Sequence, residues 1–359
     1  MKHSPYMEWA KLHSDSTYKL ALSGVPDQAL DVLGADWREI ALHGPNSYGY
    51  APLCEAIAAR YGVAPESVVS VSGGTSFANH LALAALLERG DEVLLEQPVY
   101  DPILAVLRYL GAEVQRFTRH FTDGFTLDID EIKRALTPRT RLIVLTNLHN
   151  PSSVLTDNET LREVGALARE NGARVLVDEV YLDAMYEARQ PSAVTLGEEF
   201  VVTSSLTKAF GLSGLRCGWI LAAPDVAHSI RRFNDLFGVI APHVAEGLSV
   251  AAFQRLDELS ARFAPILAHN RTLWREFLAA HADTLSAAPT AYGTTSFPRL
   301  LRGDVDKLCD ILRETYATTI VPGRFFESPA HFRIGLCGDT ATLEQGLANL
   351  HAAMGKVKR

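Results

Sequence analysis

A lysine among hydroxyl residues and glycines is the strongest chemical feature of the sequence. The segment at 205–218 reads SLTKAFGLSGLRCG, with Lys208 in fourth place, and follows the apolar run Phe200 to Ser204. That run predicts a buried strand, so Lys208 should lie just beyond its carboxyl end. Burial disfavours the charged form of an amine, and a neutral amine is a nucleophile and a base. The alternative is a surface lysine with an exposed arginine eight residues later.

Two further loops carry groups that could bind a ligand. The loop at 72–76 reads SGGTS, where small residues let backbone N–H groups approach a phosphate and the following helix N-terminus favours negative charge. Asp178 ends the apolar run Arg174 to Asp178, and Tyr181 follows it closely. For both loops the alternative is an ordinary turn with a capping serine or aspartate.

The elements that must position these residues alternate between strand and helix from Val68 to Ala222. The predicted strands lie at 68–71, 92–96, 113–117, 141–146, 174–178, 200–204 and 217–222, and the predicted helices at 76–87, 103–110 and 157–170. This alternation indicates a mainly parallel sheet with helices on both faces. In such sheets ligands bind at the carboxyl ends of the strands, which is where the polar loops fall.

The pattern changes after Pro224. A long helical region is predicted over 226–281, interrupted near Pro242 and Pro265. Strands at 294–301, 318–321 and 331–336, a helix at 305–316 and a last helix follow. We expect a smaller α+β C-terminal domain at 241–359, joined by an N-terminal segment at 1–45, beside a large domain at 46–240.

Composition restricts the function classes. The 359 residues carry a formal net charge of -8 with no dense basic run, which makes nucleic acid an improbable partner. Four widely spaced cysteines favour neither a disulfide framework nor a metal site. Since no secretory signal or membrane-length apolar stretch is visible, we expect a cytoplasmic protein without a membrane partner.

The segment around Lys208 matches S-x-[ST]-K-x-x-G-x-x-G-x-R-x-G at every fixed position. The chain resembles the class I/II (aspartate-aminotransferase-like) pyridoxal-phosphate enzymes of fold type I over nearly its whole length. This resemblance implies a three-layer α/β fold and pyridoxal 5'-phosphate bound to Lys208 as a Schiff base, with the freed amine as the general base. It further implies that the cofactor phosphate is held by Ser205, Thr207, Arg216, Gly74, Thr75 and Ser76.

The same resemblance assigns the cofactor ring. Asp178 would keep the pyridine nitrogen protonated, Tyr181 and Asn150 would hydrogen-bond the ring phenolate, and Tyr100 would stack on the ring. The segment TNLHNPSS departs from the family's N-P-x-N-P-[TS]-G at Leu148 and Ser153, so an Asn-Pro turn without a ligand is the alternative there.

Substrate contacts are implied at Arg333, which would hold the α-carboxylate, and at Gly24 and Asn150. A solvated arginine on an edge strand is the alternative for Arg333. Candidates for the substrate side chain are Tyr18, Trp37 and Phe237, with Arg324 and Arg232 as possible partners of a second carboxylate.

Transfer of an amino group between an L-amino acid and a 2-oxo acid is the expected reaction. A carbon–sulfur β-lyase or an amino-acid oxidase or cyclase of the same fold is the alternative, because the residues assigned are common to all of them. A regulatory domain would need a basic DNA-binding segment, and a dinucleotide-binding dehydrogenase would need G-x-G-x-x-G; the sequence shows neither. A homodimer is expected, although the spacing around Tyr48 and Tyr50 departs from the pattern of family members that share a tyrosine between subunits.

Overall fold

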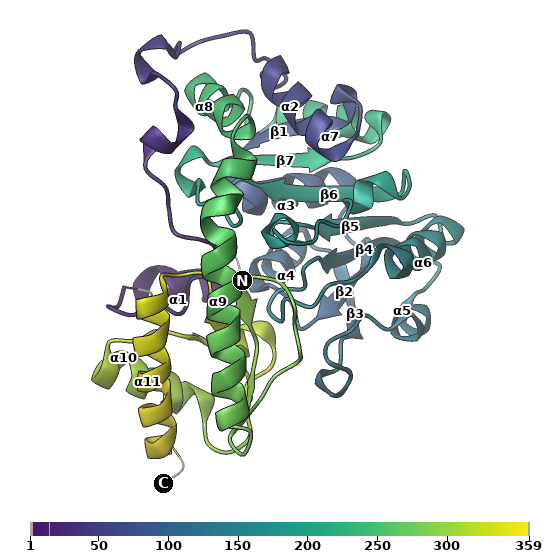
Figure 1. The fold of residues 1–359 in the computed structure, drawn as a ribbon. Helices are drawn as coiled ribbons and strands as arrows, with labels where there is room; N and C mark the ends of the chain where they lie inside the picture. Colours follow the sequence, from purple (N-terminus) through teal and green to yellow (C-terminus); the bar gives the residue numbers. More distant parts are fainter. Residues whose placement is uncertain (1–2, 14, 358–359) are drawn as a thin grey trace.

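The computed structural model describes residues 3–13 and 15–357, and a seven-stranded sheet dominates it (Figure 1). The strand order is β1-β7-β6-β5-β4-β2-β3. The strands are β1 (Val68–Ser72), β2 (Glu92–Gln97), β3 (Glu113–Thr118), β4 (Thr140–Thr146), β5 (Arg174–Asp178), β6 (Phe200–Ser205) and β7 (Cys217–Leu221). Only β7 runs antiparallel to its neighbours in this sheet, so the predicted mainly parallel α/β sheet is confirmed.

Two helical layers cover the sheet because its strands are apolar on both faces. Val93 and Leu95 of β2 face one layer, and Leu94 between them faces the other. The first layer holds α3 (Gly74–Leu86), α4 (Asp101–Leu110) and α7 (Pro224–Asn234). The second holds α2 (Ala51–Tyr61), α5 (Ile129–Ala135), α6 (Asn158–Glu170) and α8 (His243–Phe253). The predicted three-layer arrangement is confirmed.

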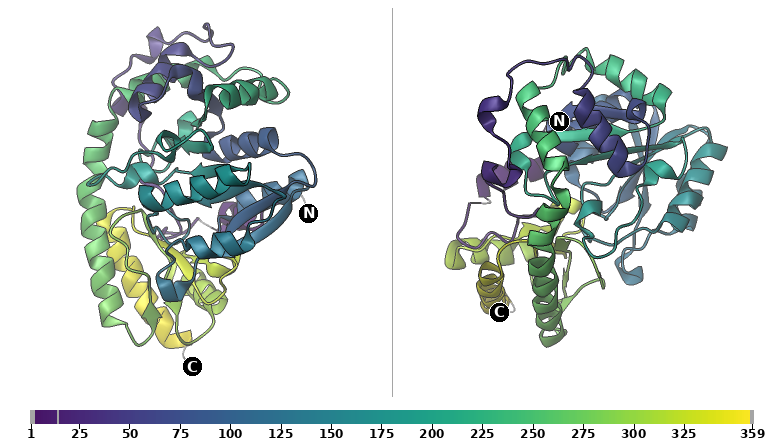
Figure 2. Two further views of the ribbon diagram at one scale, coloured as in Figure 1. Left: turned by 90° about the vertical axis from the view of Figure 1, so that its right-hand side faces the viewer. Right: turned by 45° about the horizontal axis from the view of Figure 1, so that its top comes forward.

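A second apolar core lies beside the sheet, and the long helix α9 (Leu256–Ala280) packs in it. Figure 2 shows α9 running from the sheet to the helices and short strands of this second part. The core contains side chains of α10 (Val305–Tyr316), α11 (Thr340–Val357), β8 (Leu285–Ser286), β10 (Arg299–Leu300) and β12 (Phe332–Gly335). The strands β9 (Thr295–Ser296) and β11 (Val321–Pro322) pair with β12. Short 3-10 helices η1 to η8 lie at Leu30–Leu33, Trp37–Glu39, Pro65–Ser67, Phe121–Asp123, Leu182–Ala184, Ala193–Thr195, Ser213–Leu215 and Gly323–Phe326.

The predicted helix break near Pro265 is wrong, whereas the break near Pro242 is present. Pro265 lies inside α9, which is flanked there by the buried side chains of Phe263 and Leu267. A proline inside a helix removes one hydrogen bond, and packing on both sides offsets that loss. The strand predicted at 294–301 is likewise divided into β9 and β10, with Pro298 between them.

The N-terminal residues pack on the second core. Leu20 and Val25 belong to its apolar cluster, and Tyr18 forms a β-bridge with Thr318. The helix α1 (Pro5–His13) packs against α4. The division into 1–45, 46–240 and 241–359 stays a prediction. In the described part of the chain no helix is both long and apolar enough to cross a membrane.

A buried ion pair fixes the carboxyl end of the sheet. Nε of Arg119 lies 2.8 Å from Oε2 of Glu96, and both side chains are fully buried. The other carboxylate oxygen accepts hydrogen bonds of 2.7 Å from the backbone and the hydroxyl of Thr146, the last residue of β4. The pair therefore joins β2 to β4 where the polar loops begin.

We expect Arg119→Met to destabilise the protein by about 3–5 kcal/mol, because it leaves the Glu96 carboxylate buried without its cation. The matched control is Arg134→Met, which removes an exposed arginine paired with Glu131 and should cost far less, because solvent screens an exposed ion pair. Urea unfolding of both variants measures the difference. Equal unfolding midpoints would show that the buried pair contributes no more than a surface pair.

Candidate active site

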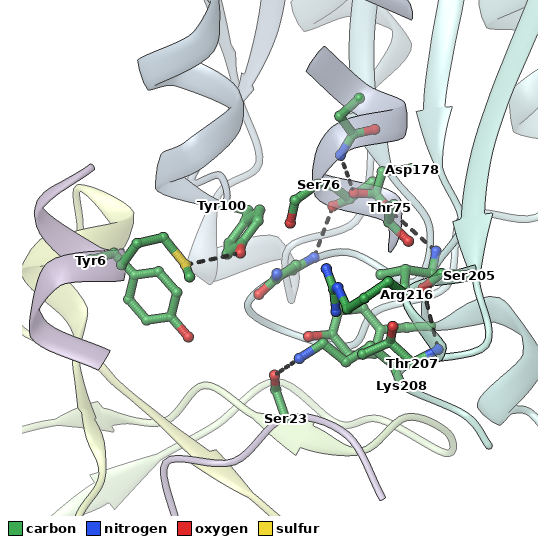
Figure 3. A pocket seen from close by; sticks show the side chains of 16 residues that line it. Tyr6, Ser23, Thr75, Ser76, Tyr100, Asp178, Ser205, Thr207, Lys208 and Arg216 are labelled. Atoms are coloured by element: carbon green, nitrogen blue, oxygen red, sulfur yellow. Dashed lines mark hydrogen bonds between the residues drawn. The ribbon is translucent and has the colours of Figure 1, made fainter. Parts of the chain in front are cut away.

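A cavity opens at the carboxyl ends of the parallel strands β4, β5 and β6 (Figure 3). Ten of the predicted site residues line it: Thr75, Ser76, Tyr100, Asn150, Asp178, Tyr181, Ser205, Thr207, Lys208 and Arg216. The remaining three, Gly24, Gly74 and Arg333, each contact one of these ten. Residues more than 300 positions apart in the sequence thus meet at one site.

Lys208 projects into this cavity from the loop after β6. Its Nζ donates a hydrogen bond of 3.0 Å to Oγ of Ser23, as Figure 3 shows. Burial, assisted by the positive charge of Arg333, lowers the pKa of Lys208. Gly24 packs against the lysine, since a Cβ at this position would lie 2.9 Å from Cδ of Lys208. The amine is therefore biased towards its neutral, reactive form.

Asp178 lies at the end of β5, at the centre of the carboxyl edge. Its carboxylate accepts hydrogen bonds from Nδ2 of Asn79 at 2.7 Å and from the backbone of Val180 at 3.0 Å. Thr203 donates in turn to the amide oxygen of Asn79, which fixes the orientation of that amide. Burial raises the pKa of Asp178 to about 6, although its hydrogen bonds and Lys208 oppose the shift. A positively charged group beside this carboxylate would restore its ionised form.

The part of the cavity next to the N-terminus of α3 suits a phosphate. Gly73 and Gly74 have φ of +126° and +69°, and they lead directly into α3, which has no side-chain cap. The hydroxyl of Thr75 is buried without a hydrogen-bond partner in the structure. Arg216 donates to the carbonyl oxygen of Gly73 and reaches the same loop. A helix N-terminus without a side-chain cap, an unpaired hydroxyl and a guanidinium suit a phosphate dianion.

The two remaining predicted phosphate ligands come from the loop after β6. Ser205 ends β6, and its Oγ accepts a hydrogen bond of 3.3 Å from the backbone of Thr207. Both residues line the cavity together with Ser76. The six predicted phosphate ligands therefore lie at the cavity or against Arg216, and together with Asp178 they suit a phosphorylated pyridine.

Asn150 is fixed by a chain of hydrogen bonds that starts at the buried ion pair. The hydroxyl of Thr146, which donates to Glu96, accepts from the backbone of Asn150 at 2.8 Å. Oδ1 of Asn150 accepts from Nη1 of Arg333 at 3.1 Å. A guanidinium only donates, so this contact fixes the amide orientation and leaves Nδ2 of Asn150 to donate elsewhere. The departures at Leu148 and Ser153 leave Asn150 at the cavity.

His149 fastens the Asn150 loop to the loop that carries Tyr100. Its Nε2 lies 2.9 Å from the carbonyl oxygen of Pro98, and its Nδ1 lies 2.6 Å from Oγ of Ser152. A carbonyl only accepts, so Nε2 carries the proton. Burial and the charge of Arg119 hold the pKa of His149 well below its usual value, which keeps the ring neutral.

Arg333 lies on β12, the middle strand of the small sheet β11-β12-β9, and is 1% exposed. The alternative of a solvated edge arginine is therefore wrong. Nη2 donates to the hydroxyl of Tyr6 at 2.7 Å, and Nε is buried without a hydrogen-bond partner. A buried guanidinium with an unused donor is suited to a carboxylate ligand.

Several side chains considered for the substrate lie elsewhere. Arg324 pairs with Asp306, and Arg232 pairs with Asp235 and Tyr48. Neither arginine lines the cavity, and neither do Tyr18 and Phe237. The side chain of Trp37 is outside the described part of the structure.

Sequence patterns missed six residues that line the cavity: Tyr6, Met7, Ser23, Asn79, Thr146 and Val180. Thr146 and Val180 are adjacent to predicted loops, so the ends of the predicted strands could have indicated them. Asn79 is a polar residue on a mainly apolar helix, which is a weaker signal. Tyr6 and Met7 lie in α1, and nothing in their local sequence indicates the cavity.

Asp178→Asn should change the pH dependence of stability in the cofactor-free protein. Burial raises the pKa of Asp178 from 3.8 to about 6. The protonated carboxyl therefore contributes stability in full below pH 3.8, and this contribution is lost as the pH rises through about 6. Between pH 4 and pH 7.5 the free energy of unfolding of the variant should therefore rise by up to about 3 kcal/mol relative to that of wild type. Urea unfolding at both pH values tests this, with the exposed Asp130→Asn as control. A pH-independent difference would refute the raised pKa.

Comparisons with known proteins agree with this site. The sequence model of "Aminotransferase class I and II" matches residues 38–350. Capreomycidine synthase of Streptomyces vinaceus is 31% identical over 314 residues, which cover 87% of this chain and 80% of that protein. A probable N-succinyldiaminopimelate aminotransferase of Mycobacterium tuberculosis is 29% identical, with 80% of this chain and 76% of that protein covered.

Solved structures of similar proteins extend over the whole chain. A PLP-dependent aminotransferase from Streptococcus suis superimposes with a TM-score of 0.93 at 25% identity, covering 100% of both chains. The PLP-dependent cyclase OrfR superimposes with a TM-score of 0.87 at 26% identity, covering 99% of this chain and 98% of that chain. The chain therefore belongs to the class I and II aminotransferase family and is an enzyme that depends on pyridoxal 5'-phosphate.

Proposed function

We propose that the protein is an aminotransferase that moves an amino group between an L-amino acid and a 2-oxo acid. One observation carries the proposal: the amine of Lys208, the carboxylate of Asp178 and the guanidinium of Arg333 converge around a single cavity. These groups provide a base, a partner for a protonated ring nitrogen and a binding group for a carboxylate.

The protein's own groups divide the work. Arg333 binds the α-carboxylate and so holds the amino acid next to Lys208. The bound cofactor supplies an electron sink for the bond that is broken at the α-carbon. Lys208, whose pKa is lowered by burial, takes the α-proton as a neutral amine and returns it during the second half of the reaction. Asp178 would stabilise positive charge on the ring nitrogen of the bound cofactor, and Nδ2 of Asn150 and the hydroxyl of Tyr181 would donate to its ring oxygen.

A substrate with an uncharged side chain fits this chain best. The cations near the cavity, in the part of the chain that the structure describes, are Lys208, Arg216 and Arg333, and each has a role at the amine, the phosphate or the α-carboxylate. Met7 and Tyr100 line the side near α1, with the hydroxyl of Tyr100 donating to the sulfur of Met7 at 3.4 Å. A mainly apolar wall favours an apolar or aromatic side chain.

A cyclase is the second candidate. The likeness to capreomycidine synthase at 31% identity, and the structural likeness to the cyclase OrfR, support it. The two proposals differ in the product. A cyclase consumes its amino acid without releasing the matching 2-oxo acid, and a carbon–sulfur β-lyase would release ammonia and pyruvate instead.

Lys208→Ala should slow the reaction strongly, because it removes the amine that takes the α-proton. Wild-type holoenzyme mixed with a panel of L-amino acids should release the matching 2-oxo acid from at least one of them. We expect Lys208→Ala to react about 10²–10⁴-fold more slowly or worse. Lys307→Ala, on the exposed face of α10, is the control and should react like wild type. An amino acid that is consumed without its 2-oxo acid would replace the aminotransferase proposal with the cyclase or lyase.

We also propose a homodimer. Apolar side chains are exposed together at Leu236, Phe237, Val239 and Ile240, and Val239 shares a surface hollow with Tyr48. Exposed apolar patches of this kind are typical of interfaces. Sedimentation of wild type should therefore give twice the mass of the chain, whereas Phe237→Glu should shift the protein towards monomer. A wild-type monomer at micromolar concentration would contradict the proposal.

A further inference from the structure

Tyr6 is the residue at the cavity whose role neither the sequence motifs nor the proposed mechanism explains. Its side chain comes from α1, far from the phosphate end, and its hydroxyl is directed into the cavity (Figure 3). The residue is buried, and its hydroxyl lies 2.7 Å from Nη2 of Arg333. Tyr6 therefore connects the N-terminal helix with the group that binds the α-carboxylate.

The chemistry of this contact fixes the direction of the hydrogen bond. A guanidinium has N–H donors and no acceptor, so the phenol oxygen of Tyr6 must accept. The proton of the phenol is then free to be donated, and the hydrogen bonds of the described residues give it no acceptor. Next to it, Nε of Arg333 is also a donor without a partner. A phenol O–H at the cavity and a neighbouring guanidinium N–H without a partner suit an anionic group with two oxygens.

Aromatic packing holds Tyr6 in this position. The guanidinium of Arg333 lies 5.4 Å from the ring centroid of Tyr6 and 5.1 Å from that of Phe326. The Tyr6 ring also packs edge-on against Tyr100 at 5.6 Å and Phe325 at 6.0 Å. Because the ring is already ordered, binding a ligand through its hydroxyl requires little further loss of side-chain freedom.

A purely structural role, in which Tyr6 only orients Arg333, makes no use of the phenol proton. An aromatic ring alone packs on the guanidinium, as the ring of Phe326 does. The Tyr6 hydroxyl instead lines the cavity, where its proton can be donated to a ligand oxygen. The hydroxyl is therefore better explained as a binding group.

We propose that Tyr6 is a substrate-binding residue whose hydroxyl donates a hydrogen bond to the α-carboxylate held by Arg333. This inference rests on the proposed amino-acid substrate and deepens it. The Tyr6–Arg333 pair selects amino acids with a free α-carboxylate over the corresponding amines and amides. An amine or an amide has no anionic group that can accept hydrogen bonds from both the Tyr6 hydroxyl and the Arg333 guanidinium. The N-terminal helix α1 is thus part of the substrate site.

Tyr6→Phe tests the proposal in the holoenzyme, since it keeps the ring and removes only the hydroxyl. The probes are the L-amino acid that perturbs the cofactor absorbance at the lowest concentration, its decarboxylated amine and its carboxamide. We expect the dissociation constant of the amino acid to rise about 10–100-fold, the effect of one hydrogen bond to a charged group. Binding of the amine, of the amide and of the cofactor should change less than about twofold. Tyr61→Phe, which removes a hydroxyl bonded to Asp183, is the control and should bind every probe like wild type.

A double variant separates direct binding from orientation of Arg333. If the hydroxyl contacts the carboxylate, Tyr6→Phe should still weaken amino-acid binding at least about threefold in an Arg333→Gln background. If it only orients Arg333, the double variant will bind like Arg333→Gln alone, which overturns the proposal. Unchanged amino-acid binding in Tyr6→Phe, or wild-type binding of the amine as tight as that of the amino acid, would also overturn it. Because the readout is binding, the result stands apart from whether a 2-oxo acid is released.

Discussion

Three buried ionisable groups meet at one site, and the cost of removing them from water constrains the rest of that site. Lys208 and Asp178 line the cavity, and Arg333 contacts Asn150 beside it. Charges inside a protein cost several kcal/mol each unless they are paired or well hydrogen-bonded. Among the described residues none of the three forms an ion pair, and their hydrogen bonds are made with neutral groups such as Ser23, Asn79 and Asn150. The charged forms of Lys208 and Asp178 are therefore disfavoured, since burial lowers the pKa of Lys208 and raises that of Asp178. A ligand that brings a phosphate, a cationic ring nitrogen and a carboxylate completes the pairing.

The sheet supplies the rigidity that such a site needs. Its strands are buried on both faces, so their carboxyl ends have little freedom to move. The Glu96–Arg119 pair fixes the end of β4, and hydrogen bonds lead from it through Thr146 to Asn150 and on to Arg333. This chain of contacts crosses from the large sheet to the small one. The position of Arg333 thus depends on a salt bridge that does not line the cavity.

The N-terminal residues close the site from the other side. Ser23 accepts from Lys208, Gly24 allows the chain to approach the lysine closely, and Tyr6 contacts Arg333. The thiol of Cys337 donates to the carbonyl oxygen of Gly24 at 2.9 Å, which ties this segment to the second core. Residues from the first 25 positions and from β12 therefore meet at the reacting groups, and the motifs around Lys208 give only part of the site.

The sequence by itself determined the sheet, its helical layers and the ten residues that line the cavity from the loops after the strands. It could do so because strand periodicity is local and because polar loops after parallel strands necessarily fall at the same edge. Only the tertiary structure decided the partners that come from elsewhere, such as Tyr6 on Arg333 and Asn79 on Asp178, since no local pattern encodes a contact between distant segments. The same reason explains the error at Pro265: a proline predicts a helix end locally, but the packing of Phe263 and Leu267 in the second core keeps α9 continuous.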